Sequence, residues 1–209
     1  MIGLAIHTSS PELGLALQDL EQGTQRSQVW PLGRDLTAYL HECLVDFVSP
    51  YAWSDVAYIA VAKGPGGFTG TRIGVVVART LAQQLQIPLF GVSSLAAIAQ
   101  HHQLTTIQDP ERLDPVAVSL RAQRGEIFGA IYQPQKPVAT PLLPESLYAQ
   151  ADWDTKLSHW PTPLHLIPAE GGLAHTVSGV LTRAQQQWQA GDRPAWSSVL
   201  PFYGQHPVH

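Results

Sequence analysis

The sequence has few charged residues and no run of Lys or Arg. Only 13% of its 209 residues are charged, against about a quarter in typical soluble domains. Because charges normally cover the surface, this low fraction indicates that a partner covers part of it, although 17 Pro and 17 Gly also lower the fraction. The 12 basic residues are scattered and the formal net charge is −4. Proteins that grip a phosphate backbone unaided carry a basic stripe, so strong direct nucleic-acid binding is not expected.

Cysteine is nearly absent, and long apolar runs are missing. The single residue Cys43 excludes an internal disulfide and a cysteine-rich metal site. It lies among apolar residues of an expected helix, which favours a buried structural thiol over a nucleophile. No segment approaches the ~20 apolar residues of a membrane-spanning helix, and the first residues lack the pattern of a signal peptide. We therefore expect a cytoplasmic protein without membrane association.

Short apolar runs, turn residues and helical spacings predict a two-lobed α/β protein. A polar stretch over 103–114 marks the expected boundary between an N-terminal lobe, 1–102, and a C-terminal lobe, 103–209. The region from Pro134 to Pro163, rich in Pro and Trp, gives no clear pattern. The expected strands are 2–8, 14–18, 28–32, 56–62, 87–92, 115–120, 126–132 and 164–168, and the expected helices are 35–48, 69–86, 95–101 and 173–188.

A glycine-rich segment, GPGGFTGTRIG from Gly64 to Gly74, follows an apolar strand and begins a helix. This arrangement is the usual frame of a phosphate site. The spacing fails for both common motifs, however. Gly70 is followed by Thr71-Arg72 where a Walker loop needs Lys-Ser/Thr, and Thr69 stands where the dinucleotide fingerprint needs its third glycine. Neither nucleotide motif is therefore present.

The same segment begins a series of small residues at every fourth position: Gly66, Gly70, Gly74, Ala78 and Ala82. On a helix such a series forms a ridge that lets another element approach closely. Apolar residues occupy most of the remaining circumference, which indicates burial on more than one side. Two interpretations follow. The helix is packed on all sides by its own chain, or one of its faces is shared with a partner.

Over these eleven positions the chain resembles the TsaB (YeaZ) family, whose signature is GPGSFTGxRIG, with Gly67 in place of the common Ser. The similarity continues through Ile87-Pro88 and 91–95, and it includes 6–9, Gly125-Glu126 and 201–203. The resemblance implies the two-lobed fold of actin, Hsp70 and sugar kinases (the ASKHA fold), with a βββαβα plan in each lobe. It also implies a non-catalytic subunit that supports the enzyme TsaD in transferring a threonylcarbamoyl group to N6 of adenosine 37 of tRNA.

Several positions depart from the pattern of the family. His7 stands where an Asp is usual in the fold, and Arg121-Ala122-Gln123 replaces Asp-Ala-Arg in the second hairpin. An imidazole does not replace a hard carboxylate ligand of magnesium, so we expect no ATP hydrolysis by this chain alone and no metal site. No two of the nine histidines are four positions apart, as the metal pair of TsaD requires. Leu36, where the family often has His, is a further departure.

The resemblance implies a heterodimer with TsaD through the two helices of the first lobe, joined by the ATPase TsaE. It implies no cofactor of its own, ATP or ADP only at the complex, and contact with tRNA only through the complex. The expected interface residues are Leu36, Tyr39, Leu40, Cys43, Gly70, Arg72, Ile73, Gly74, Val76, Val77, Ala78 and Leu81. A vestigial nucleotide site is expected at Thr8, Ser9, Gly125 and Glu126. The alternatives are a small-molecule or sugar kinase of the same fold and a homodimeric structural module.

Overall fold

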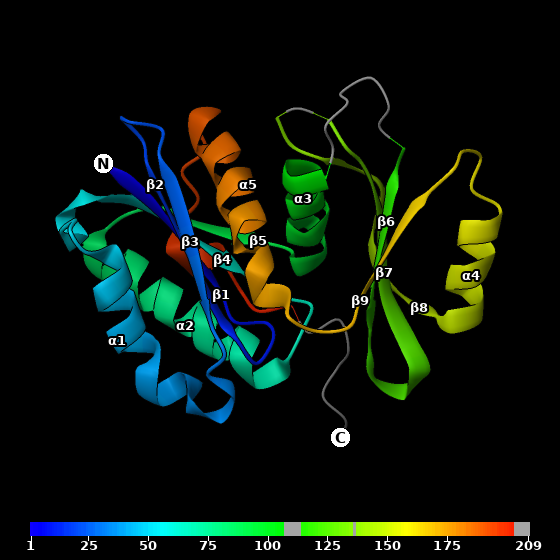
Figure 1. Ribbon diagram of the computed structural model, residues 1–209, viewed down its shortest axis with the longest axis horizontal. Helices are drawn as coiled ribbons and strands as arrows, with labels where there is room; N and C mark the ends of the chain where they lie inside the picture. Colours follow the sequence, from blue (N-terminus) through cyan, green and yellow to red (C-terminus); the bar gives the residue numbers. More distant parts are fainter. Residues whose placement is uncertain (107–113, 136, 203–209) are drawn as a thin grey trace.

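The computed structural model describes residues 1–106, 114–135 and 137–202. Most of the polar stretch expected at 103–114 lies outside the described residues, as does Tyr203 of the 201–203 motif. Two β-sheets stand side by side with helices between them and on their outer faces (Figure 1). Among the described residues, no helix is both long and apolar enough to cross a membrane.

The first sheet has five strands in the order β3-β2-β1-β4-β5. The hairpins β1–β2 and β2–β3 are antiparallel, whereas β4 pairs with β1 and β5 with β4 in parallel. The strands are β1 (Ile2–His7), β2 (Leu13–Asp19), β3 (Gln25–Trp30), β4 (Val56–Ala62) and β5 (Leu89–Val92). Leu and Ile side chains on one face of β1 and β2 pack against α1 (Leu36–Val48) and α2 (Phe68–Leu85).

The second sheet has four strands in the order β8-β7-β6-β9, with β9 parallel to β6. The strands are β6 (Val116–Arg121), β7 (Glu126–Gln133), β8 (Thr140–Ala149) and β9 (His165–Ala169). Helix α4 (Gln150–Ser158) covers the outer face, where the ring of Trp153 lies directly over Gly129. A side chain at position 129 would collide with that ring, so the glycine permits the close packing of α4 on β7.

Two helices, α3 (Ser94–Thr106) and α5 (Val177–Gln189), form the layer between the sheets (Figure 1). Their buried side chains belong to one continuous core with small residues of the first sheet, such as Ala5 and Ala16, and with Val118 and Phe128 of the second. The small side chains let α5 and the short helix η4 (Leu173–Thr176) approach the first sheet closely. At Gly14, for example, an added Cβ would strike the carbonyl group of Ala174.

The order of the elements confirms the predicted fold class. The chain runs β1-β2-β3-α1-β4-α2 in the first lobe, and β6-β7-β8-α4-β9-α5 repeats the βββαβα plan in the second. The segment without a clear pattern contains β8 and α4. The expected boundary at 102/103 stays a prediction: α3 runs through it to Thr106, and α5 returns from the second half of the chain to the first sheet.

Candidate functional site

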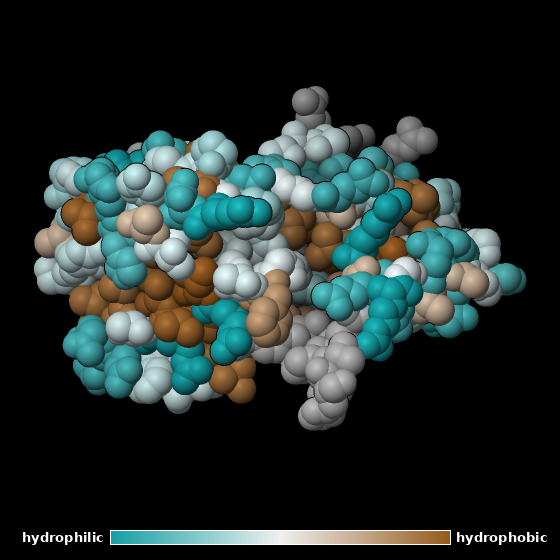
Figure 2. All heavy atoms as spheres, turned by 90° about the horizontal axis from the view of Figure 1, so that it is seen from below, coloured by the Kyte–Doolittle hydropathy of each residue, from teal (hydrophilic) through white to brown (hydrophobic). Residues whose placement is uncertain are grey.

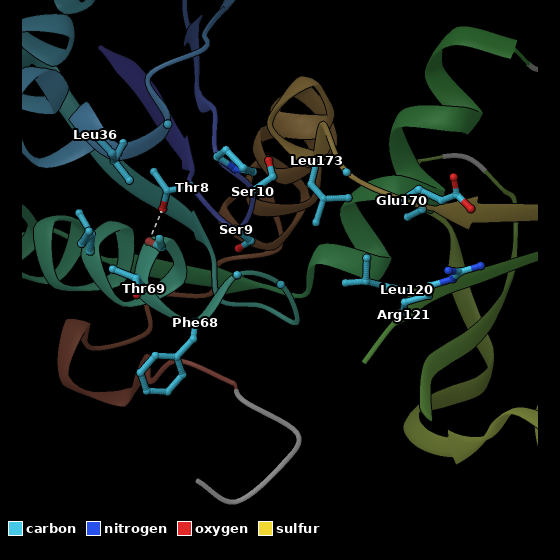
Figure 3. A pocket seen from close by; sticks show the side chains of 18 of the residues that line it. Thr8, Ser9, Ser10, Leu36, Phe68, Thr69, Leu120, Arg121, Glu170 and Leu173 are labelled. Atoms are coloured by element: carbon cyan, nitrogen blue, oxygen red, sulfur yellow. Dashed lines mark hydrogen bonds between the residues drawn. The ribbon is translucent and has the colours of Figure 1, made fainter. Parts of the chain in front are cut away.

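A cleft of about 1390 Å³ opens between the two lobes (Figure 3). One wall consists of the β1–β2 loop, the start of α1 and the start of α2; the other consists of the ends of β6 and β9 and the start of β7. The first wall contributes Thr8, Ser9, Ser10, Pro11, Gly33, Arg34, Leu36, Thr37, Gly66, Gly67, Phe68, Thr69, Gly70 and Ile73. The second contributes Leu120, Arg121, Ala122, Gln123, Phe128, Ala169, Glu170 and Gly171. Leu173, at the start of η4, lines the cleft beside Ser10 of the first lobe (Figure 3).

The β1–β2 loop lies directly against the small-residue ridge of α2. The Thr8 hydroxyl donates a hydrogen bond to the Gly70 carbonyl oxygen at 2.8 Å, and the Gly67 amide donates to the Ser9 carbonyl oxygen at 2.7 Å. An added Cβ at Gly66, Gly70 or Gly74 would strike Thr8 or Ser9. The ridge is therefore packed by its own chain, whereas the outer side of α2 stays exposed at Phe68 and Val76.

Four of the expected interface residues are buried within the chain. Leu36, Leu40, Gly74 and Ala78 are buried on the faces of α1 and α2 that cover the first sheet. Helical spacing shows that a face is covered but not which element covers it, so a role of these four residues at a partner surface stays a prediction. The role of the remaining residues, which are at least partly exposed, stays a prediction: Tyr39, Cys43, Gly70, Arg72, Ile73, Val76, Val77 and Leu81.

An apolar surface remains on the outer side of α1 and α2. Tyr39 is 50% exposed, Phe68 49% and Val76 58%. Seen from below, apolar side chains gather on the half of the molecule formed by the first lobe, bordered by hydrophilic ones (Figure 2). Burial, reinforced by the charges of Glu42 and Asp46, raises the pKa of the Cys43 thiol. The reactive thiolate is therefore disfavoured on this surface.

His7 is fully buried at the end of β1. Its Nδ1 accepts a hydrogen bond from the Ser9 amide at 3.3 Å, so the neutral ring carries its proton on Nε2. Burial, together with the nearby His175, lowers the pKa of His7 to about 3. Nε2 has no hydrogen-bond partner in the described part of the chain. The ring is therefore neutral at physiological pH, and it offers no anionic oxygen at the position where the fold usually has an Asp.

The second hairpin contributes only in part to the cleft. Arg121, Ala122 and Gln123 line it, whereas Gly125 and Glu126 are absent from its lining. The Ala122 amide donates to the Glu126 carbonyl oxygen at 2.8 Å and closes a tight turn in which Gly125 has φ +76°. Of the expected vestigial nucleotide site, the structure thus brings Thr8 and Ser9 into the cleft but not Gly125 and Glu126.

The sequence analysis missed Arg34 and Glu170, which line opposite walls. The signal for Glu170 is its place between the end of β9 at Ala169 and the pair Gly171-Gly172, both at positive φ. On the first wall, the Ser9 hydroxyl is buried without a hydrogen-bond partner in the described residues, and no side chain caps the N-terminus of α2. Among the described residues, no group of three or more His, Cys, Asp or Glu side chains has the placement of a metal site.

A family model described as TsaD, tRNA N6-adenosine threonylcarbamoyltransferase, matches residues 42–170, more than half of the chain. Two curated relatives are named tRNA threonylcarbamoyladenosine biosynthesis protein TsaB. That of Bacillus subtilis (strain 168) is 34% identical over 155 residues, which are 72% of this chain and 63% of the relative. That of Escherichia coli (strain K12) is 30% identical over 132 residues, 62% of this chain and 54% of the relative.

The chain belongs to this threonylcarbamoyltransferase family, on its TsaB (YeaZ) branch. Its match spans less than two thirds of the length of these two TsaB relatives. Among solved structures, a protein with similarity to YeaZ from Pseudomonas aeruginosa is 25% identical with a TM-score of 0.75, covering 98% of this chain and 99% of that one. YeaZ from Pseudomonas aeruginosa, 24% identical with a TM-score of 0.77 over 97% and 99% of the two chains, shares the fold.

Proposed function

We propose that this chain is the non-catalytic TsaB-type subunit that supports TsaD in the transfer of a threonylcarbamoyl group to N6 of adenosine 37 of tRNA. Membership of the family is the observation that carries the proposal. The chemistry of the cleft supports the non-catalytic role. His7 and Arg121 occupy positions where enzymes of this fold have acids, and neither side chain supplies the oxygen ligands that magnesium prefers.

The partner surface in this proposal is the exposed side of α1 and α2. Val76, Tyr39 and Phe68 leave apolar area in water, and exposed apolar patches are typical of sites where proteins meet. In this proposal TsaD binds there and TsaE joins the pair. The same face pairs two copies of the chain when TsaD is absent. ATP or ADP binds only at the complex, and tRNA is reached only through it.

Reconstitution tests the proposal. The cognate TsaD and TsaE are incubated with threonylcarbamoyl-adenylate and tRNA, with and without this chain, and the modified adenosine is measured. We expect modification to depend on the chain, and size-exclusion chromatography to show a complex with TsaD. Equal modification with and without the chain, or the absence of a complex, would overturn the proposal.

A further inference from the structure

An acidic residue of the second lobe reaches the start of the helix that both lobes share. Glu145 lies on β8, the edge strand of the second sheet, and its carboxylate accepts a hydrogen bond from the Ser93 hydroxyl, 52 positions away along the chain. The Ser93 oxygen in turn accepts from the amides of Leu95, at 3.1 Å, and Ala96, at 3.4 Å, and so caps the N-terminus of α3. The Ser93 hydroxyl is thus hydrogen-bonded both to the start of α3 and to a side chain of β8.

A β-bulge accommodates Glu145 in β8. Gly129 pairs with Ser146 and Ile131 with Leu143, so Pro144 and Glu145 together lie opposite Ala130. Bulges of this kind re-aim side chains, and proline, which has no N–H to donate to a sheet, is tolerated there. The side chain of Glu145 thereby shares a face with Ala130, whose small size leaves room beside α3.

The contacts that partly offset the burial of the Glu145 carboxylate are found where α3 and β8 meet. Burial raises the pKa of Glu145, and the Ser93 hydroxyl and the positive charge of Lys63 oppose that effect. The positive end of the α3 dipole also favours an anion near Ser93. If β8 moved away from α3, the Glu145 carboxylate and the Ser93 hydroxyl would lose this charge-assisted hydrogen bond.

The hydrogen bonds continue from Ser93 into the wall of the cleft. The neighbouring Ser94 amide donates to the carbonyl oxygen of Gly64 at 2.8 Å. Gly64 begins the glycine-rich turn whose later residues, Gly66 to Gly70, line the cleft on the side of the first lobe. A connected set of contacts therefore runs from that wall through the start of α3 to the edge strand of the second sheet.

We propose that the Glu145–Ser93 hydrogen bond is a latch between the lobes, which sets the width of the cleft by fixing the second sheet to the start of α3. Breaking the latch while leaving the helix cap intact frees the second lobe to move and widens the cleft. The proposal concerns the chain alone. It stands or falls independently of the role in tRNA modification.

The test measures the width of the cleft by electron–electron distance spectroscopy. Spin labels are placed at the exposed cleft residues Thr37 and Glu170 in a Cys43→Ala background, since Cys43 is the only native cysteine. Ser93→Asp keeps a good N-cap but sets a second carboxylate against Glu145, whereas Ser93→Asn keeps the cap and donates an amide N–H to it. Glu145→Ala removes the acceptor, Glu145→Gln retains a neutral one, and Ser146→Ala is the control on the same strand.

We expect Ser93→Asp and Glu145→Ala to shift the distances to longer or broader values. Ser93→Asn, Glu145→Gln and Ser146→Ala should keep the parent distribution. Unchanged distances in Ser93→Asp and Glu145→Ala would overturn the proposal. If Glu145→Ala does not fold, the comparison of Ser93→Asp with Ser93→Asn decides alone. Failure of Ser93→Asp to fold, while Ser93→Asn folds, would show that the contact maintains the fold rather than the cleft width, and would also overturn it.

Discussion

The side chain of Thr8 lies on the backbone of α2 between Gly70 and Gly74, and its hydroxyl donates to the Gly70 carbonyl oxygen at 2.8 Å. This contact holds the β1–β2 loop on the glycine ridge, and the loop forms one wall of the cleft. The glycines that mark the family in the sequence thus act within the chain, by letting a loop approach a helix without intervening side chains.

Replacing Gly74 with Ala should destabilise the protein, because the new methyl group would collide with the Thr8 side chain. Alanine favours helices by about 1 kcal/mol over glycine, but overpacking a buried site costs about 1–3 kcal/mol. We expect a net fall in the free energy of unfolding, measured by urea denaturation. An increase in stability would contradict the contact between Thr8 and α2.

Gly67→Ser is the matched substitution at an open position. Gly67 is the N-cap of α2, its φ is negative, and an added Cβ would meet only the Ser9 carbonyl oxygen, at 3.6 Å. Serine is a better N-cap than glycine by a few tenths of a kcal/mol. The same denaturation experiment should therefore show a stability equal to or slightly above that of the parent, and a loss as large as that of Gly74→Ala would argue against this geometry.

Val76→Asp should weaken binding to the cognate TsaD without unfolding the chain, since Val76 is 58% exposed. A charge in an apolar contact costs several kcal/mol when it is left unpaired, so we expect at least a tenfold rise in Kd by titration calorimetry. Leu166→Asp is the control, because Leu166 is 55% exposed on the second lobe. Equal affinities for both variants and the parent would place the partner surface elsewhere.

Acid should destabilise the fold through His7. The pKa of this residue is about 3 in the folded protein, below the 6.5 of an unfolded chain. The unfolded state therefore binds the proton first, and stability that is complete above pH 6.5 falls steadily towards pH 3. For His7 alone the loss is about 2 kcal/mol at pH 5. Urea titrations from pH 7 to pH 5 should show this fall, and His7→Asn should reduce it, whereas substitution of the exposed His159 by Gln should not.

Magnesium–ATP should not bind to the isolated chain at micromolar concentrations. The residues at the two expected acid positions are His7, neutral and buried, and Arg121, which carries the wrong charge for a metal ligand. Titration calorimetry together with an assay of phosphate release measures both properties. Micromolar binding with turnover would favour the kinase alternative over the supporting role.

Much of this architecture could be predicted from the sequence. Turn residues between short apolar runs located the strands of the first lobe, and β4 was placed at 56–62, where it lies. β8 and α4 were missed because Pro141 and Pro144 interrupt the strand pattern at a bulged edge strand. The pairing of Ser93 with Glu145 was also beyond reach, since no local pattern links residues 52 positions apart.

The cleft was predictable at one wall only. Thr8 and Ser9 follow the first strand, and their place beside a glycine-rich turn is fixed by the parallel pairing of β1 with β4. The opposite wall depends on how the second sheet turns its strand ends toward the first lobe, which the sequence does not encode locally. The family resemblance placed Gly125 and Glu126 in the cleft. On this hairpin, however, the cleft lining ends at Gln123.

The layer of helices between the sheets determines when the first sheet can complete its packing during synthesis on the ribosome. Ala5, Ala16 and Tyr58, on the inner face of the first sheet, are covered by helices that include α5, Val177–Gln189. All five strands of that sheet are synthesised before this helix leaves the exit tunnel. One apolar face of the nascent first lobe therefore stays uncovered until residues 177–189 have emerged, and the final packing of this sheet begins only then.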